Sequence, residues 1–166
     1  MATLDTKILE KFDRDIAETF LKAPGGFLTG LPKYLGVNIV DVGPGTLRAE
    51  MHVKDELLTP FGNIHGGVLA AVCDHVLGCV CYPLMERGSW AATTEFKLNL
   101  LAPVSGGVVI ADAKIVSMTR STAVVLIEVF NEERLVCVSQ GTVTIRPPRK
   151  RGAAKASDAG AGQAES

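Results

Sequence analysis

The sequence predicts an α+β fold in which an antiparallel sheet wraps around one long central helix. Two observations support this prediction. Residues 68–85 form an almost continuous apolar run with valine and leucine at helical spacing, and a helix that is apolar all round has to be buried. Two strand-like segments precede this run and four follow it, joined by short turns, which is typical of an antiparallel sheet that packs on a single helix.

The strand-like segments follow one another closely. The first two, residues 34–42 and 46–53, flank a Gly-Pro-Gly turn, and polar and apolar residues alternate in the second as in a strand with one wet face. The remaining four lie at residues 91–101, 107–117, 122–130 and 135–146. Ser-Gly-Gly at 105–107 and Asn-Glu-Glu-Arg at 131–134 mark turns, so these strands are expected to form an antiparallel meander.

The N-terminal region predicts an additional amphipathic helix over residues 4–21. Its apolar residues recur every four positions with charged residues between them, and Ala-Pro-Gly-Gly at 23–26 ends it. The chain thus divides into an N-terminal helix and linker (1–26), a core domain (27–147) and a tail (148–166). Pro, Gly, Ala and Ser dominate the tail without apolar periodicity, which predicts disorder.

The composition is that of a globular protein and narrows the possible partners. Hydrophobic residues make up 47% of the 166 residues and charged residues 21%. With 17 basic and 18 acidic residues the formal net charge is −1, so no global field attracts nucleic acid. Asp74, His75 and Pro83 interrupt the central apolar run, which favours a buried helix over a membrane span, and the charged N-terminus lacks the apolar core of a signal peptide. We therefore expect a cytoplasmic protein that binds neither nucleic acid nor membranes.

Two polar features stand at the central helix. His65-Gly66-Gly67 precedes it, and the carboxylate of Asp74 lies in its middle, where burial of an unpaired charge demands a partner or a function. His65 and Asp74 are nine residues apart, which is about 900° of helical rotation and about 13 Å along the axis. Within one chain they are expected to point to opposite sides. A site that uses both then has to combine two copies, and the spacing predicts at least a homodimer.

His-Gly-Gly, the aspartate nine residues after the histidine, and the later run FKLNLLAPV resemble the hotdog-fold acyl-CoA thioesterases of the PaaI type. The resemblance covers about residues 34–146, including the order of elements. It implies a hotdog fold, hydrolysis of acyl-CoA thioesters to free acid and coenzyme A, and a homotetramer built as a dimer of dimers. It implies no metal and no cofactor other than coenzyme A as part of the substrate.

The resemblance also assigns roles at the helix start. Free backbone N–H groups and the helix dipole at this end attract negative charge, and the resemblance makes the Gly66 N–H the oxyanion donor. His65 would orient the loop or the thioester, and Gly67 would contact the substrate. For Asp74 two roles stay open, general base toward water or nucleophile, and we favour the base because an aspartate side chain is short. Apolar neighbours on the helix are expected to remove water from the carboxylate and strengthen it as a base.

Other positions depart from the family pattern. Thr59 stands where relatives often carry Asn or Gln to hold the carbonyl, and Asn63 is a possible substitute. Gly78 stands where some relatives use Ser or Thr to position water, a task that we assign to Thr93 or Thr94 on the next strand.

Cations are required for the phosphates of coenzyme A. Arg120 and Ser121, with Thr122 beside them at a hairpin, occupy the place where relatives often contact the nucleotide. Lys97 and Arg146 are weaker candidates. Ordinary exposed strand and turn charges would look the same in sequence, so a structural interpretation of each remains open.

Rival functions find less support. The sequence holds no G-x-S-x-G, H-E-x-x-H, G-x-G-x-x-G or P-loop motif, and its four cysteines have neither zinc nor disulfide spacing and are expected to be small buried hydrophobes. One alternative keeps the fold without chemistry, as an acyl-CoA-binding sensor. Others are hydration or dehydration of acyl thioesters, and a structural partner that uses the first helix or the tail. The acyl group itself is not predicted, because generic aliphatic residues line the strands.

Overall fold

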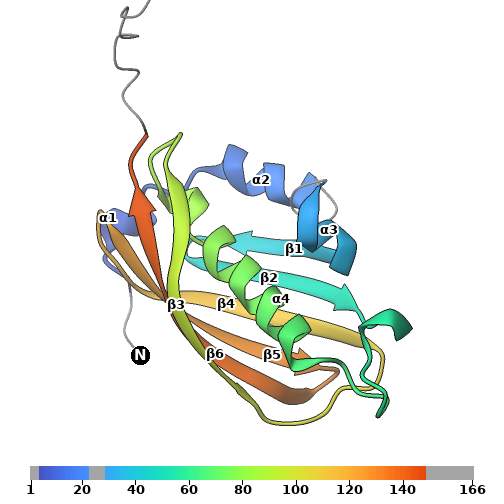
Figure 1. Cartoon of the computed structure of the whole chain (residues 1–166). Coiled ribbons are helices and arrows are strands. Elements are labelled where there is room, and N and C mark those ends of the chain that lie inside the picture. The colour runs from blue at the N-terminus through green and yellow to red at the C-terminus, as the bar shows by residue number, and fades with distance from the viewer. Residues whose placement is uncertain (1–3, 23–28, 149–166) are drawn as a thin grey trace, which may run out of the picture.

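The computed structural model describes residues 4–22 and 29–148, and these form a six-stranded antiparallel sheet curved around one helix (Figure 1). The strand order is β1-β2-β4-β5-β6-β3. The strands are β1 Val37–Gly43, β2 Thr46–His52, β3 Trp90–Leu100, β4 Val108–Met118, β5 Thr122–Asn131 and β6 Arg134–Arg146. The helices are α1 Thr6–Leu9, α2 Arg14–Lys22, α3 Gly30–Leu35 and α4 Gly66–Cys79, with short 3₁₀ turns η1 Asp55–Leu57 and η2 Tyr82–Leu84. The predicted sheet around a central helix is confirmed.

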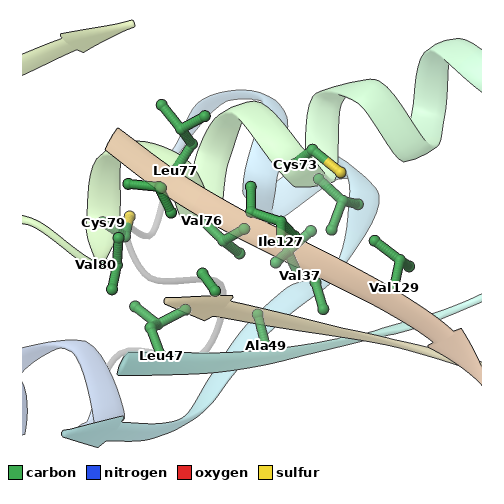
Figure 2. Close-up of a cluster of buried hydrophobic side chains, with 14 of the residues drawn as sticks. Val37, Leu47, Ala49, Cys73, Val76, Leu77, Cys79, Val80, Ile127 and Val129 are labelled. Carbon is green, nitrogen blue, oxygen red and sulfur yellow. The ribbon is translucent and has the colours of Figure 1, made fainter. Parts of the chain in front are cut away.

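Helix α4 is held against the concave face of the sheet by large apolar side chains. In Figure 2 its side chains point toward residues of β1, β2 and β5. The buried residues of the helix are Leu69, Val72, Cys73, Val76, Leu77 and Cys79. Full burial of a side chain the size of Val or Leu stabilises a fold by about 1.5–3 kcal/mol, so this one side of α4 accounts for much of the core. By length and composition Gly66–Leu84 would also pass as a membrane span, but more than half of it is buried inside the protein, as in a core helix.

Gly141 on β6 sets how closely α4 approaches the sheet. A Cβ at this position would collide with the Leu77 side chain, and would lie 2.6 Å from the Phe96 Cβ and 2.9 Å from the Glu95 carbonyl oxygen. The neighbouring strand β3 has a register shift between Thr93 and Glu95, beside this glycine. The absent side chain therefore leaves room for both the helix and the irregular strand.

The N-terminal helix predicted over residues 4–21 is wrong in one respect, because it is broken into α1 and α2. The Asp13 carboxylate accepts hydrogen bonds from the Asp15 and Ile16 N–H groups and thereby caps α2. The Asp13 N–H donates to the Pro83 carbonyl at 2.7 Å, and the Arg87 guanidinium binds the carboxylates of both Asp13 and Asp15. Contacts with the turn that follows α4 thus interrupt the helix while its apolar residues still face the core.

The first predicted strand also begins too early. Residues 34 and 35 belong to α3, which ends at Gly36 in the left-handed conformation (φ +77°), and β1 starts at Val37. A glycine at this position is the usual helix C-terminal signal. The linker residues 23–28 and the tail residues 149–166 lie outside the described residues, so the predicted disorder of the tail stays a prediction.

Strand β3 lies at an edge of the sheet. In the described residues it pairs with β6 alone, and most of its residues are exposed. Its apolar exposed residues, together with the residue that follows the strand, are Trp90, Leu100 and Leu101, each more than half exposed. A long strand edge with unpaired backbone groups and apolar side chains favours pairing with another chain.

Candidate active site

The loop before α4 is a tight, internally bonded turn. The Thr59 N–H donates to the Asn63 carbonyl at 2.7 Å, and the Gly62 N–H donates to the Thr59 carbonyl at 2.9 Å. The Thr59 hydroxyl accepts the Phe61 N–H, and Gly62 has the positive φ (+77°) that the turn requires. The Thr59 side chain therefore shapes the loop. Phe61 at its tip is 89% exposed, and this is a feature that the sequence analysis missed.

Two backbone hydrogen bonds fix the end of this loop at the helix start. The Ile64 N–H donates to the Val104 carbonyl, and the His65 N–H donates to the Leu57 carbonyl. His65 is the N-cap residue, with extended backbone, and its side chain makes no capping hydrogen bond. A structural role of the imidazole as helix cap is therefore not observed. Its exposed side chain is available to a ligand.

The two glycines after His65 differ in what surrounds them. A Cβ on Gly66 would lie 2.5 Å from the Leu100 Cδ1 of β3, the end of an exposed side chain that would have to shift. A Cβ on Gly67 would meet nothing within 4 Å, and no positive φ requires a glycine. As the first residues of α4, both carry N–H groups that the helix itself leaves without acceptors. The helix start thus presents backbone donors beside open space.

Asp74 is exposed, so the expectation that this side of α4 is buried in one chain is wrong. The physical reason is that the sheet covers only one side of the helix. Gly67, Ala71 and Gly78 lie at helical spacing with Asp74 on the other side, and each is exposed or half-buried. A Cβ on Gly67 or Gly78 would meet nothing within 4 Å, whereas Ala71 packs partly against the core.

His75, the next residue, is directed elsewhere. It is half-buried, and both ring nitrogens lie 3.7–3.8 Å from the Cys79 Sγ one turn further along α4. Burial lowers the pKa of His75, which disfavours the imidazolium, although the nearby Asp74 charge acts in the opposite direction. This imidazole is part of the packing.

The structure separates the two threonines of β3. In the register with β6, Thr93 pairs with Val143, whose side chain is buried on the α4 side of the sheet. The Thr94 hydroxyl instead bonds the Thr144 hydroxyl at 2.6 Å on the opposite face. Thr93, which is exposed, is therefore the threonine on the side of α4.

A large cleft lies beyond the C-terminal end of α4. It has a volume of about 1060 Å³, and Arg120, Ser121 and Arg146 are among its lining residues. The hairpin that carries Arg120 is rigid, because the Thr119 hydroxyl accepts the Ser121 and Thr122 N–H groups. Lys97 does not line this cleft and is paired in register with Gln140 on the outer face.

The described cysteines are enclosed in the core. All four are buried and free, and burial raises the pKa of Cys79 and Cys81 to about 12. Among residues 4–22 and 29–148, no group of three or more His, Cys, Asp and Glu side chains could hold a metal ion. The exposed carboxylate of Asp74 and the backbone donors of the helix start are the groups suited to chemistry near α4.

The sheet, the central helix and the residues at its start define a class of protein. The family model of the thioesterase superfamily matches residues 61–138, which include His65, Asp74 and the whole of β3, β4 and β5, and the chain belongs to this superfamily of thioester hydrolases. The predicted hotdog fold and the resemblance to PaaI-type thioesterases are confirmed by the relatives and solved structures.

Among its relatives, the chain is 30% identical over 122 residues to the 1,4-dihydroxy-2-naphthoyl-CoA hydrolase of Listeria monocytogenes, covering 73% of this chain and 99% of that protein. It is 25% identical over 134 residues to mouse acyl-coenzyme A thioesterase 13, covering 79% and 91%. The crystal structure of a Haemophilus influenzae thioesterase matches with a TM-score of 0.73 and 26% identity, covering 79% and 93%. The Escherichia coli PaaI protein of the phenylacetic acid degradation operon matches with a TM-score of 0.63 and 25% identity, covering 69% and 82%.

Proposed function

We propose that this protein hydrolyses acyl-CoA thioesters to a free acid and coenzyme A, at sites shared between two copies of the chain. The observation that carries the proposal is the position of Asp74 on an uncovered side of α4, halfway along the helix from the donors at its start. Those donors and this carboxylate are separated by about 13 Å along the axis within one chain. A second copy lying across the small residues of α4 would bring its own Asp74 to the helix start.

The electrophilic end of the site would be the start of α4. A thioester carbonyl oxygen at the Gly66 N–H gains most stabilisation when it becomes an oxyanion in the tetrahedral intermediate, which is the requirement for catalysis. The rigid loop and its hydrogen bonds to Val104 and Leu57 hold this donor in place before substrate arrives. The exposed His65 would orient the thioester, and Gly67 would leave space for it.

Asp74 from the second copy would act as general base. It takes a proton from water, the water oxygen bonds to the carbonyl carbon, and the intermediate collapses by breaking the C–S bond. The departing thiolate recovers the proton, so that acid and free thiol are the products. Thr93, on the α4 side of β3, is the hydroxyl that we assign to holding the water.

The dimer would form along β3. Its unpaired backbone edge and its exposed apolar residues would be covered by the same strand of a second copy, next to the uncovered side of α4. We further propose that two such dimers form a homotetramer. The cleft at Arg120 and Ser121 would receive the phosphates of coenzyme A, which enters only as part of the substrate, and no metal takes part in the reaction.

Free-thiol release tests the proposal. Medium- and long-chain acyl-CoAs, phenylacetyl-CoA and benzoyl-CoA would be compared on wild type and Asp74→Asn, with circular dichroism as a check on folding. Loss of a general base lowers turnover by about 10²–10⁴-fold, and we expect at least a hundredfold fall in kcat with ligand binding kept. Unchanged turnover in the variant would sink the mechanism. Binding of acyl-CoA without turnover in wild type would instead favour a sensor.

A further inference from the structure

The N-terminal segment forms one wall of the cleft at Arg120. Ile8 of α1 and Lys11 of the turn that follows it line the cleft, opposite the β4–β5 hairpin. This segment precedes residue 61, where the match to the thioesterase superfamily begins. The cleft is therefore lined partly by residues inside the matched region and partly by an N-terminal segment that lies outside it.

The wall is held firmly in place. Leu4 and Ile8 pack against the core, and Leu4 lies so close to Gly45 that a Cβ on that glycine would be 2.7 Å from its Cδ1. Asp13 is hydrogen-bonded through its N–H to Pro83, and its carboxylate receives two hydrogen bonds from the Arg87 guanidinium, at 2.6 and 2.9 Å. Lys11 is thus presented from a fixed backbone, although its side chain is exposed.

The chemistry of the cleft suits an anion with an apolar body. Its floor is apolar, formed by the side chains Ile8, Leu84, Met85, Met118 and Ile145. The cleft is lined by four cationic side chains and by two carboxylates, whereas the whole chain carries a formal net charge of −1. Arg87 is occupied by Asp13 and Asp15, whereas no ion pair of Lys11, Arg120 or Arg146 occurs within the described part of the chain.

The distance from the chemistry fits coenzyme A. Helix α4 ends at Cys79, five residues or about 7.5 Å beyond Asp74, and Leu84 and Met85 of the cleft lie in and just after the short turn η2 that follows. The arm that joins the thiol of coenzyme A to its diphosphate contains two amide units and corresponds to four or five residue lengths, about 15 Å when extended. A thioester near Asp74 would place the nucleotide in this cleft.

We propose that Lys11 of the N-terminal segment is a binding residue for the phosphates of coenzyme A, acting together with Arg120 and Arg146. The adenine ring would lie on the apolar floor beside Ile8 and Met118. This inference rests on the proposed function for the identity of the ligand. It adds a substrate contact from the N-terminal segment, to which the sequence analysis assigned no contact with the substrate.

Kinetics on three forms of one thioester test this inference: an acyl-CoA, its 3′-dephospho form and the corresponding acyl-pantetheine. Lys11→Glu is expected to raise KM for acyl-CoA about tenfold with kcat unchanged, because it replaces a charge-assisted contact by a repulsion. KM for acyl-pantetheine, which lacks the nucleotide, would stay within about twofold. The effect would shrink at high ionic strength, since exposed charges are screened. A smaller effect on the dephospho form would place Lys11 at the 3′-phosphate, and an equal effect would place it at the diphosphate.

Lys7→Glu is the matched control, because Lys7 is an exposed lysine of α1 that does not line the cleft. It should leave all kinetic constants within about twofold of wild type. An unchanged KM in Lys11→Glu, an equal rise on acyl-pantetheine, or an equal effect of Lys7→Glu would overturn the inference. Calorimetry of coenzyme A binding tests the role of Lys11 separately from the proposed hydrolysis. Weaker binding by Lys11→Glu alone supports the inference even if wild type hydrolyses no thioester, and unaltered binding contradicts it.

Discussion

The two sides of α4 differ in composition and in burial. The side toward the sheet carries Leu69, Val76 and Leu77, all buried, and its composition follows from packing within one chain. The other side carries Gly67, Gly78 and Asp74, which are small or charged, and nothing within the described chain buries them. A glycine inside a helix destabilises it by about 1 kcal/mol relative to alanine. The comparison teaches that the first side makes the fold, whereas the second is left open for the subunit contact proposed above.

The largest expected effect is at the start of the uncovered side. Gly66→Pro removes the N–H proposed to bind the oxyanion, while proline is well tolerated at the first position of a helix and His65 already has the extended backbone that it requires (ψ 131°). Removal of an oxyanion donor lowers kcat by about 10²–10³-fold, and we expect this loss in thiol-release assays.

Gly66→Ala is the control for that variant. It adds the same Cβ against the flexible end of Leu100 but keeps the N–H. It should retain most of the turnover. Similar losses in both variants would mean that the steric contact with Leu100, and not the missing donor, causes the defect.

The buried side should respond in stability instead of catalysis. Leu77 is fully buried against Gly141, and Leu77→Ala is expected to lower the free energy of unfolding by about 2–5 kcal/mol. Urea unfolding measures this loss, and kcat per folded molecule should stay close to wild type. By contrast, Asp74→Asn should change the unfolding midpoint much less, since no side chain in the described part of its own chain buries Asp74. A catalytic defect in Leu77→Ala without a loss of stability would break the distinction between the two sides.

The smallest effect concerns the N-terminal wall of the cleft. The hydrogen bonds from Arg87 hold the pKa of Asp13 below its ordinary value of 3.8. The stabilisation from this carboxylate is therefore complete above that pH and is lost as pH falls toward the lowered value. Wild type should lose stability more steeply than Arg87→Gln below about pH 4, measured as denaturant midpoints over a pH series. Parallel curves would show that the pair does not stabilise the fold.

Most of the fold could be predicted from local patterns in the sequence. The last four strands were predicted to within one residue, because turn residues separate them along the chain. The break at residues 10–13 was missed because it depends on bonds from Asp13 to Pro83 and Arg87, which lie 70 and 74 residues further along the chain. The short helix α3 was missed because its six residues show no apolar period, and only Gly36 marks its end.

The candidate site was harder to predict from the sequence pattern than the fold. The sequence singled out Asp74 but predicted it to be buried, because alanine and glycine count as apolar whether they face a core or an open surface; in the structure Asp74 is exposed. The pairing of Thr94 with Thr144 depends on strand register and could not be anticipated. Lys11 was overlooked because its neighbours in the cleft come from distant hairpins and loops.

The central claim is that Gly66 and Asp74 of different copies form one site. Gly66→Pro and Asp74→Asn, each inactive alone, would be co-refolded in equal amounts and assayed for thiol release. Random pairing makes half of the dimers mixed, and one of the two sites in each mixed dimer keeps both native residues, so about one quarter of wild-type activity should return. Activity no greater than that of the separate variants, with mixed dimers verified by mass spectrometry, would contradict a shared site and place both residues in one chain.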